Sequence, residues 1–311
     1  MSQELSIARK QYTPRDKLGK DRFNVKLSFE AEVPSNSYLF TGAFISRIDI
    51  YSRQINILEN IAQKYLSGEI DEDEAINAIY SQHRVIEIKP SKKPPRYLDK
   101  IIIPGSSIKG VIRSRVEYKC SPSISCYSVE DRTLPPQQFY KRHVKYWGRD
   151  VVNARRTCTP DNVCIVCDLF GAPELQSRAY FSDMLMTRGE TSLLSNLGVE
   201  AINPNSKFNL EVHCINSSFL DLGLLFAGFE IFTGSYVPIC AYKYRYNPKM
   251  DGEYYMGKYV FGLVKFSIRG FKEYISRMLL NLTLNDLVLK SREALVNTLK
   301  DKIDLGKGAI Q

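Results

Sequence analysis

The chain has 311 residues, 44% of them hydrophobic, and is therefore long enough to bury one large core or two small ones. No apolar run approaches the roughly 18–20 residues of a membrane-spanning helix, and the N-terminus lacks the apolar segment of a secretion signal, so we expect a cytoplasmic protein with no membrane partner. The net charge of +9 is concentrated, because residues 89–119 hold nine Lys or Arg against two acidic residues and residues 132–156 hold seven against one. This concentration favours a polyanion-binding surface over its alternative, a solvated basic face.

The first hundred residues predict a strand and a small helical insertion. Residues 1–22 are polar and charged, and we expect a loose segment or an arm that reaches a neighbour. Residues 23–29 alternate apolar and polar side chains, which predicts a half-buried strand. Apolar residues recur at helical spacing within 53–83, where Asp71 is the expected cap of a second helix. A basic, proline-rich connector follows at residues 89–96.

Residues 101–119 join an apolar run to a basic helix through a Gly-Ser turn. The apolar run predicts the end of a buried strand, which the Pro-Gly pair terminates. One of the two serines that follow is expected to cap the helix by accepting a bond from a backbone N–H group. The helix N-terminus and the basic side chains, which we expect on one exposed face, suit a phosphate backbone, although an ordinary strand-to-helix turn is the alternative. The residues predicted to contact nucleic acid here are Gly105, Ser106, Ser107, Lys109, Arg113 and Arg115.

A long loop or hairpin is predicted for residues 120–160, which contain several prolines and little periodicity. Long loops within compact domains are usually functional or disordered, and the basic and aromatic content of this one favours function. Aromatic rings and guanidinium planes stack on unpaired bases while cations hold phosphates, so we expect this loop to grip single-stranded RNA. Packing of the rings in a core is the alternative. The residues predicted to bind RNA in this loop are Lys141, Arg142, Lys145, Tyr146 and Trp147.

The last third predicts two strands and two helices. Residues 208–214 and 264–268 alternate in the manner of half-buried strands, and helical patterns cover 271–282 and 286–299. Strands interleaved with helices predict an α+β fold, although this pattern alone does not determine the topology.

Five of the seven cysteines lie within 48 residues of one another. Cys158, Cys164 and Cys167 are expected to bind a structural zinc ion together with Cys126 or His143, because three or four thiolates can converge on one tetrahedral ion. A metal would supply folding energy to a loop with little core of its own. Buried thiols without metal, or disulfides, are the alternatives.

Residues 101–119 resemble the glycine-serine motif of the RAMP superfamily, whose members form type III CRISPR effector complexes. Residues 167–171 and 180–183 resemble the Leu-Phe-Gly segment and the Phe-Ser-Asp strand of the same family, in the family's order. The resemblance implies a ferredoxin-like (RRM-like) core sheet in a single domain over residues 23–311. Within that domain, the helical insertion at about 53–83 and the basic, Cys-containing insertion at about 120–160 would be additions to the core.

The resemblance also implies a function in antiviral defence. The chain would be a backbone-type, RNA-binding subunit that holds CRISPR RNA and the guide–target duplex, with target RNA, other RAMP subunits and the large and small subunits of the complex as partners. A stand-alone, zinc-stabilised nucleic-acid-binding protein is the alternative outside the family.

Some subunits of the family cut target RNA with an aspartate that lies between an N-terminal glycine segment and the Pro-Gly-Ser-Ser motif. Asp49 is the nearest candidate here, and as the centre of an endoribonuclease it would require Mg²⁺. The alternative for Asp49 is an ion pair with Arg47 or Arg53, or the capping of a turn.

Overall fold

The computed structural model describes residues 8, 10–42, 45–50, 55–81, 86–91, 93–121, 123–126, 158–195, 197–241 and 260–310. Within these residues the main sheet has eight strands, which run in the order β12-β14-β1-β11-β8-β6-β5, and β7 also pairs with β11. The strand pairings in this sheet are antiparallel. Its strands are β1 (Phe23–Glu32), β5 (Arg96–Tyr97), β6 (Lys100–Ile103), β7 (Ala179–Phe181), β8 (Met184–Arg188), β11 (Lys207–Ser217), β12 (Val237–Pro238) and β14 (Leu263–Tyr274).

Strand β1 lies inside the sheet, between β14 and β11, and its alternating side chains give it one apolar face. Every second residue of β1 is buried, starting at Phe23, and β11 shows the same alternation. Phe29 stacks on Phe229 with ring centroids 4.3 Å apart, and Phe23 packs edge-on against Phe219 at 5.3 Å. The three strands predicted from alternation are thereby confirmed as β1, β11 and β14.

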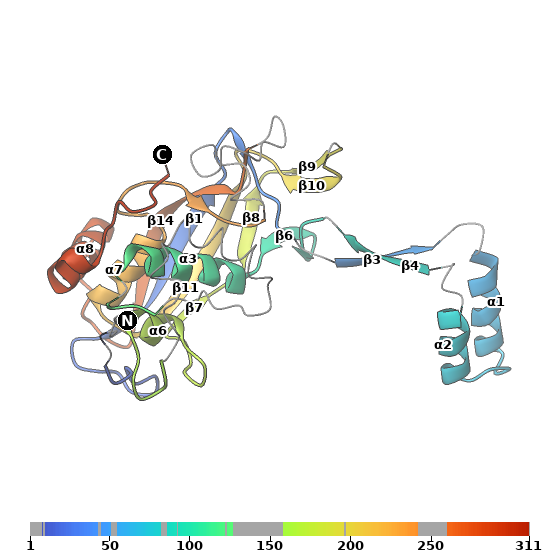
Figure 1. Cartoon of the computed structure of the whole chain (residues 1–311), viewed down its shortest axis with the longest axis horizontal. Coiled ribbons are helices and arrows are strands. Elements are labelled where there is room, and N and C mark those ends of the chain that lie inside the picture. Colours follow the sequence, from blue (N-terminus) through green and yellow to red (C-terminus); the bar gives the residue numbers. More distant parts are fainter. Residues whose placement is uncertain are drawn as a thin grey trace, which may run out of the picture.

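The helices α3 (Gly105–Lys119), α6 (Ile165–Phe170), α7 (Phe219–Gly228) and α8 (Leu284–Leu299) belong to the body that contains this sheet. Figure 1 shows α3 and α7 across one face of the sheet, with α8 beyond α7. A Cβ atom on Gly228 would lie only 2.7 Å from Ile112 Cγ2 and 2.9 Å from Val116 Cγ2, so glycine allows α7 to approach α3 closely. The result is a mixed α+β fold, as predicted.

The prediction of a helix over residues 271–282 is wrong. β14 continues to Tyr274, with Phe271 opposite Leu27 and Tyr274 opposite Asn24 on β1. A turn follows the strand, and the next helix, α8, begins at Leu284 behind a capping box of Thr283 and Asp286. Backbone pairing along β1 thus overrides the local helical spacing of apolar residues.

An arm of two strands and two helices projects from the body at the β6 side (Figure 1). β3 (Ile45–Ile50) and β4 (Ile86–Ser91) pair antiparallel, and α1 (Ile55–Leu66) and α2 (Glu72–Ser81) lie at the far end. Asp71 caps α2 as predicted, because the Glu74 backbone N–H donates to its carboxylate over 2.8 Å.

The remaining elements described are short. β9 (Thr191–Leu194) pairs antiparallel with β10 (Val199–Ile202), and β2 (Ser37–Tyr38) pairs parallel with β13 (Val260–Phe261). A 3₁₀ turn covers Lys300–Lys302. No helix among the described residues is both long and apolar enough to cross a membrane.

Candidate nucleic-acid interface and metal centre

The turn from β6 into α3 rests on the turn between β7 and β8. The Gly105 backbone N–H donates to the Asp183 carboxylate over 2.9 Å. A Cβ atom at Gly105 would lie 2.4 Å from the carbonyl oxygens of both Phe181 and Ser182, and no ordinary side chain fits at such distances. The two stretches that carry the sequence resemblance are therefore in direct contact. The carbonyl groups of Phe181 and Ser182 require glycine at position 105, and the Gly105 N–H group is the hydrogen-bond partner of Asp183.

The expectation that a serine caps α3 is wrong. The helix begins at Gly105 with Pro104 as its N-cap, and no side chain of the N-cap residue makes a capping bond. The carboxylate of Asp183 takes that place at the positive end of the helix. Ser106 and Ser107 are exposed residues of the first turn.

The three basic residues predicted on an exposed face of α3 have different surroundings. Lys109 is half-buried, and burial followed by repulsion from Arg113 lowers its pKa. Arg113 has only 13% of its side chain exposed and donates to Glu117 over 2.7 Å. Arg115 is 7% exposed and pairs with buried Glu230. The predicted exposure is wrong for both arginines, because acceptors from distant parts of the chain satisfy them inside the protein.

The other predicted catalytic and RNA-binding residues either lie in the projecting arm or fall outside the described residues. Asp49 belongs to β3 of the projecting arm, where its backbone lies opposite Glu87 of β4. The predicted RNA-binding residues of the inserted loop lie outside the described residues, as does the alternative metal ligand His143. Those loop residues are Lys141, Arg142, Lys145, Tyr146 and Trp147.

Four cysteines come together in a cluster that could bind a metal ion. The Sγ atoms of Cys126, Cys158, Cys164 and Cys167 all lie within 4.8 Å of one another. Cys126 Sγ is 3.1 Å from that of Cys167, 3.6 Å from that of Cys158 and 3.7 Å from that of Cys164. Four thiolates around zinc, with Zn–S bonds near 2.3 Å, lie about 3.8 Å apart, so the donor set fits a closed tetrahedral site. Of the two fourth ligands considered from the sequence, Cys126 is the one found in the cluster.

Hydrogen bonding favours the thiolate form at two of the four cysteines, Cys158 and Cys164. Backbone N–H groups of Cys126 and Cys167 point at Cys164 Sγ, at 3.5 and 3.4 Å. The contact with the Cys126 thiol is the main cause that lowers the pKa of Cys164 to about 6, and it lowers the pKa of Cys158 as well. The shared contacts act in the opposite direction on the other two members, because hydrogen bonds from Cys158 and Cys164 raise the pKa of Cys126 and of Cys167. Metal binding requires deprotonated thiols, and Cys158 and Cys164 are the two members whose surroundings favour that form.

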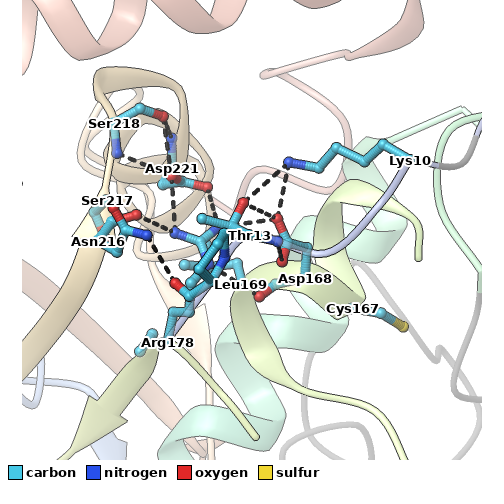
Figure 2. A network of polar contacts seen from close by, with 12 residues as sticks. Lys10, Thr13, Cys167, Asp168, Leu169, Arg178, Asn216, Ser217, Ser218 and Asp221 are labelled. Carbon is cyan, nitrogen blue, oxygen red and sulfur yellow. Dashed lines mark hydrogen bonds and ion pairs between the residues drawn. The ribbon is translucent and has the colours of Figure 1, made fainter. Parts of the chain in front are cut away.

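A buried ionic network adjoins the cluster at Asp168, the residue after Cys167 (Figure 2). Asp168 accepts from the Thr13 backbone N–H at 2.9 Å and pairs with Arg178 at 3.2 Å; Arg178 also pairs with Asp221 at 2.8 Å. Arg178 and Asp221 were not identified from the sequence. Only the Ser-x-x-Asp spacing before α7, which is typical of a capping box, could have pointed to Asp221.

The N-terminal segment, described here at residue 8 and over residues 10–22, packs against the same region. Lys10 and Val163 exchange two backbone hydrogen bonds of 2.9 Å each, and the Ala8 N–H donates to the Ser123 carbonyl oxygen. Lys10 also pairs with the Asp168 carboxylate at 2.8 Å. The segment thus contacts both stretches of chain that supply the cysteines.

A comparison with family models decides the kinship of the chain. The model described as the RAMP superfamily matches residues 37–229, which include the Gly105 turn, the Asp183 turn and all four clustered cysteines. The chain belongs to the RAMP superfamily. A solved structure, described as the crystal structure of the Csm3-Csm4 subcomplex in the type III-A CRISPR-Cas interference complex, is 14% identical, with 83% of this chain and 80% of that chain covered and a TM-score of 0.36. A comparison with curated proteins finds no match.

Proposed function

We propose that this RAMP protein is an RNA-binding subunit of a type III CRISPR ribonucleoprotein, in which it holds CRISPR RNA and the guide–target duplex. The observation that carries the proposal is the family match together with the Gly105 turn, which both motif stretches build jointly. Its proposed partners are other RAMP subunits and the large and small subunits of the complex, in the cytoplasm. Base pairing would read the sequence, while the protein would hold the backbone.

The donors proposed for the RNA backbone are the groups that remain accessible at the start of α3. Asp183 already occupies the Gly105 N–H group, so the helix N-terminus is not a bare anion site. The exposed Ser106 and Ser107 hydroxyl groups and the half-buried Lys109 ammonium group remain as donors to phosphate. Burial lowers the pKa of Lys109 because the charged ammonium group loses part of its contact with water. An ion pair with a phosphate group would offset the free energy lost in this desolvation.

The cysteine cluster is proposed to hold structural zinc. All four coordination positions would come from Cys126, Cys158, Cys164 and Cys167, so no position stays open for substrate. When bound, the ion would supply folding energy to the ends of the inserted loop. The cluster therefore serves the scaffold of the RNA site and not a reaction.

The first experiment tests RNA binding by the native complex. The complex is purified through a tag on this chain, its RNA is sequenced, and affinity for that RNA is measured against salt for Lys109→Gln. We expect the complex to contain short RNAs with a common repeat-derived end. We also expect Lys109→Gln to bind this RNA several-fold more weakly, and the slope of log affinity against log salt concentration to become shallower by about 0.7 for the one lost phosphate contact. Lys290→Gln on exposed α8 removes the same charge and is expected to change neither value.

RNA without common ends, or equal affinity and slope for the two variants, would contradict the proposed role of α3. The same preparation tests Asp49, the alternative in which the subunit is a target-RNA endoribonuclease. Mg²⁺-dependent cleavage that disappears in Asp49→Ala with RNA binding retained would establish that alternative. Cleavage that persists in the variant would remove Asp49 from consideration.

A further inference from the structure

Arg113 connects the helix of the proposed RNA contact to the cysteine cluster. Its Nε donates to Glu117 over 2.7 Å, its Nη1 to the Gly171 carbonyl oxygen over 2.9 Å, and its Nη2 to Cys167 Sγ over 3.1 Å. Each nitrogen of the guanidinium group thus has a different acceptor, and 13% of the side chain is exposed. All three nitrogens of the planar fork therefore donate to acceptors within the protein.

We propose that Arg113 is a positioning residue of the metal centre, which fixes the Cys167 thiolate and offsets the charge of the four-cysteine site. The proposal rests on the zinc centre proposed above and extends it by one residue from a different element. Four thiolates around a divalent cation carry a net charge of about −2, which a low-dielectric site tolerates only with neighbouring donors. A cation at hydrogen-bond distance from one sulfur is a strong donor of this kind.

The acceptor of Arg113 Nε has a fixed position on the same helix. Glu117 is fully buried on the same helix one turn later, so it holds the guanidinium group toward the cysteines. The simpler alternative is that Arg113 exists to neutralise Glu117 and touches Cys167 incidentally.

Lysine could not replace this arginine without loss. An ammonium group on a flexible stem is a point charge that cannot hold three acceptors in one plane. Arg113→Lys should therefore keep the charge but lose part of the orientation, whereas Arg113→Met should lose both. A spectroscopic probe at the metal can tell these two losses from a general loss of stability.

The test uses the full chain loaded with Co²⁺, whose sulfur-to-cobalt charge-transfer band reports on the thiolates. Arg113→Met is expected to weaken Co²⁺ affinity by about 10- to 100-fold and to shift the band, and Arg113→Lys to restore part of the affinity. Val116→Ala is the control, because this buried residue of α3 packs toward Gly228 of α7. It should lower thermal stability and leave band and affinity unchanged.

A wild-type band and affinity in Arg113→Met would overturn the proposal, even if the variant is less stable. Should that variant not fold, Arg113→Lys decides the matter, since wild-type values there would show that the fork is not used. Absence of Co²⁺ and Zn²⁺ binding by the unaltered chain would overturn the zinc centre itself and this proposal with it. Metal binding by the unaltered chain with no effect of Arg113 variants would overturn the positioning role alone.

Discussion

Arg178 shows how this protein keeps charge in its interior. The side chain is fully buried between the carboxylates of Asp168 and Asp221, which in turn pair with Lys10 and Arg22. Burial would raise the pKa of both aspartates, but Arg178 together with the other cations and hydrogen-bond donors outweighs burial and holds each pKa below its ordinary value. Removal of a single member leaves a buried charge without its partner. The resulting loss of stability is larger than the net stability that the intact ion pair contributes.

Asp221→Asn should therefore destabilise the fold by about 3 kcal/mol or more at neutral pH. Because folding lowers the pKa of Asp221, its contribution is complete above the ordinary carboxyl pKa and is lost as the pH falls toward the lowered value. Urea unfolding at several pH values measures this contribution. The difference in unfolding free energy between Asp221→Asn and the wild type is expected to become smaller as the pH falls.

Asp286→Asn provides the comparison for that experiment. Asp286 is an exposed cap of α8 whose pKa is also lowered, by hydrogen bonds from Thr283. Asp286→Asn should lower the unfolding free energy much less than Asp221→Asn does, because solvent screens the interactions of an exposed carboxylate. Equal effects of the two substitutions, or a gap that widens in acid, would contradict the role of the buried network.

The start of α3 depends on contact between two backbones. Gly105→Ala would place a methyl group 2.4 Å from the carbonyl oxygens of Phe181 and Ser182, which cannot move without disturbing the connection between β7 and β8. We expect a loss of about 1–3 kcal/mol in unfolding free energy, together with weaker RNA binding as the first turn is displaced.

The same helix supplies a matched control at Gly110. Apart from the chain neighbours of Gly110 and the backbone of its own helix, no atom of the described residues lies within 4 Å of a Cβ atom there, so Gly110→Ala should be neutral or stabilise the helix by up to about 1 kcal/mol. Urea unfolding and RNA titration of both variants measure the difference. A Gly105→Ala protein as stable as the Gly110→Ala protein would refute the close-approach argument.

Elements that depend on local pattern were predictable from the sequence. The period-2 alternation of β1 and β11 and the Asp71 cap need only neighbouring residues, and each is present. The helix predicted over 271–282 failed because pairing with β1 is a non-local contact. Pattern reasoning likewise treated Arg113 and Arg115 as exposed, since their acceptors Gly171 and Glu230 come from far along the chain.

The candidate site was predictable to the same limited extent. Spacing was enough to group Cys158, Cys164 and Cys167, but it left the fourth ligand open between Cys126 and a histidine. The partners of Asp168 could not be found, because Thr13 lies 155 residues away and no motif links them. Buried ionic networks depend on the three-dimensional path of the chain, which no periodicity encodes.

At the scale of the whole molecule, the cysteine cluster and the N-terminal segment should be stable only together. Removal of metal by a chelator is expected to lower the melting temperature by about 5–10 °C and to expose the N-terminal segment to trypsin, because its Lys10 packs on the Cys158–Cys167 stretch and its Ala8 on the Cys126 stretch. Cys164→Ser should reproduce both effects without a chelator.

Cys214→Ser is the control for metal removal. Cys214 is buried in β11 outside the cluster, so its replacement should lower stability while the response to chelator persists. Melting curves and tryptic digestion with and without chelator provide the readout. A trypsin-resistant N-terminal segment in the metal-free protein would show that the segment docks independently of the cluster.

The central position of β1 has a consequence for synthesis of the chain on the ribosome. Asn24 pairs with Tyr274, about 250 residues later, and the other edge of β1 pairs with β11. At a translation rate of about 5–20 residues per second, β1 therefore emerges roughly 10–50 s before its last partner. During that interval its apolar face and both hydrogen-bonding edges lack their native cover. Nascent chains released before β14 is synthesised should consequently be captured by chaperones or aggregate. Slower growth at low temperature should raise the yield of native protein only when chaperone capacity is sufficient.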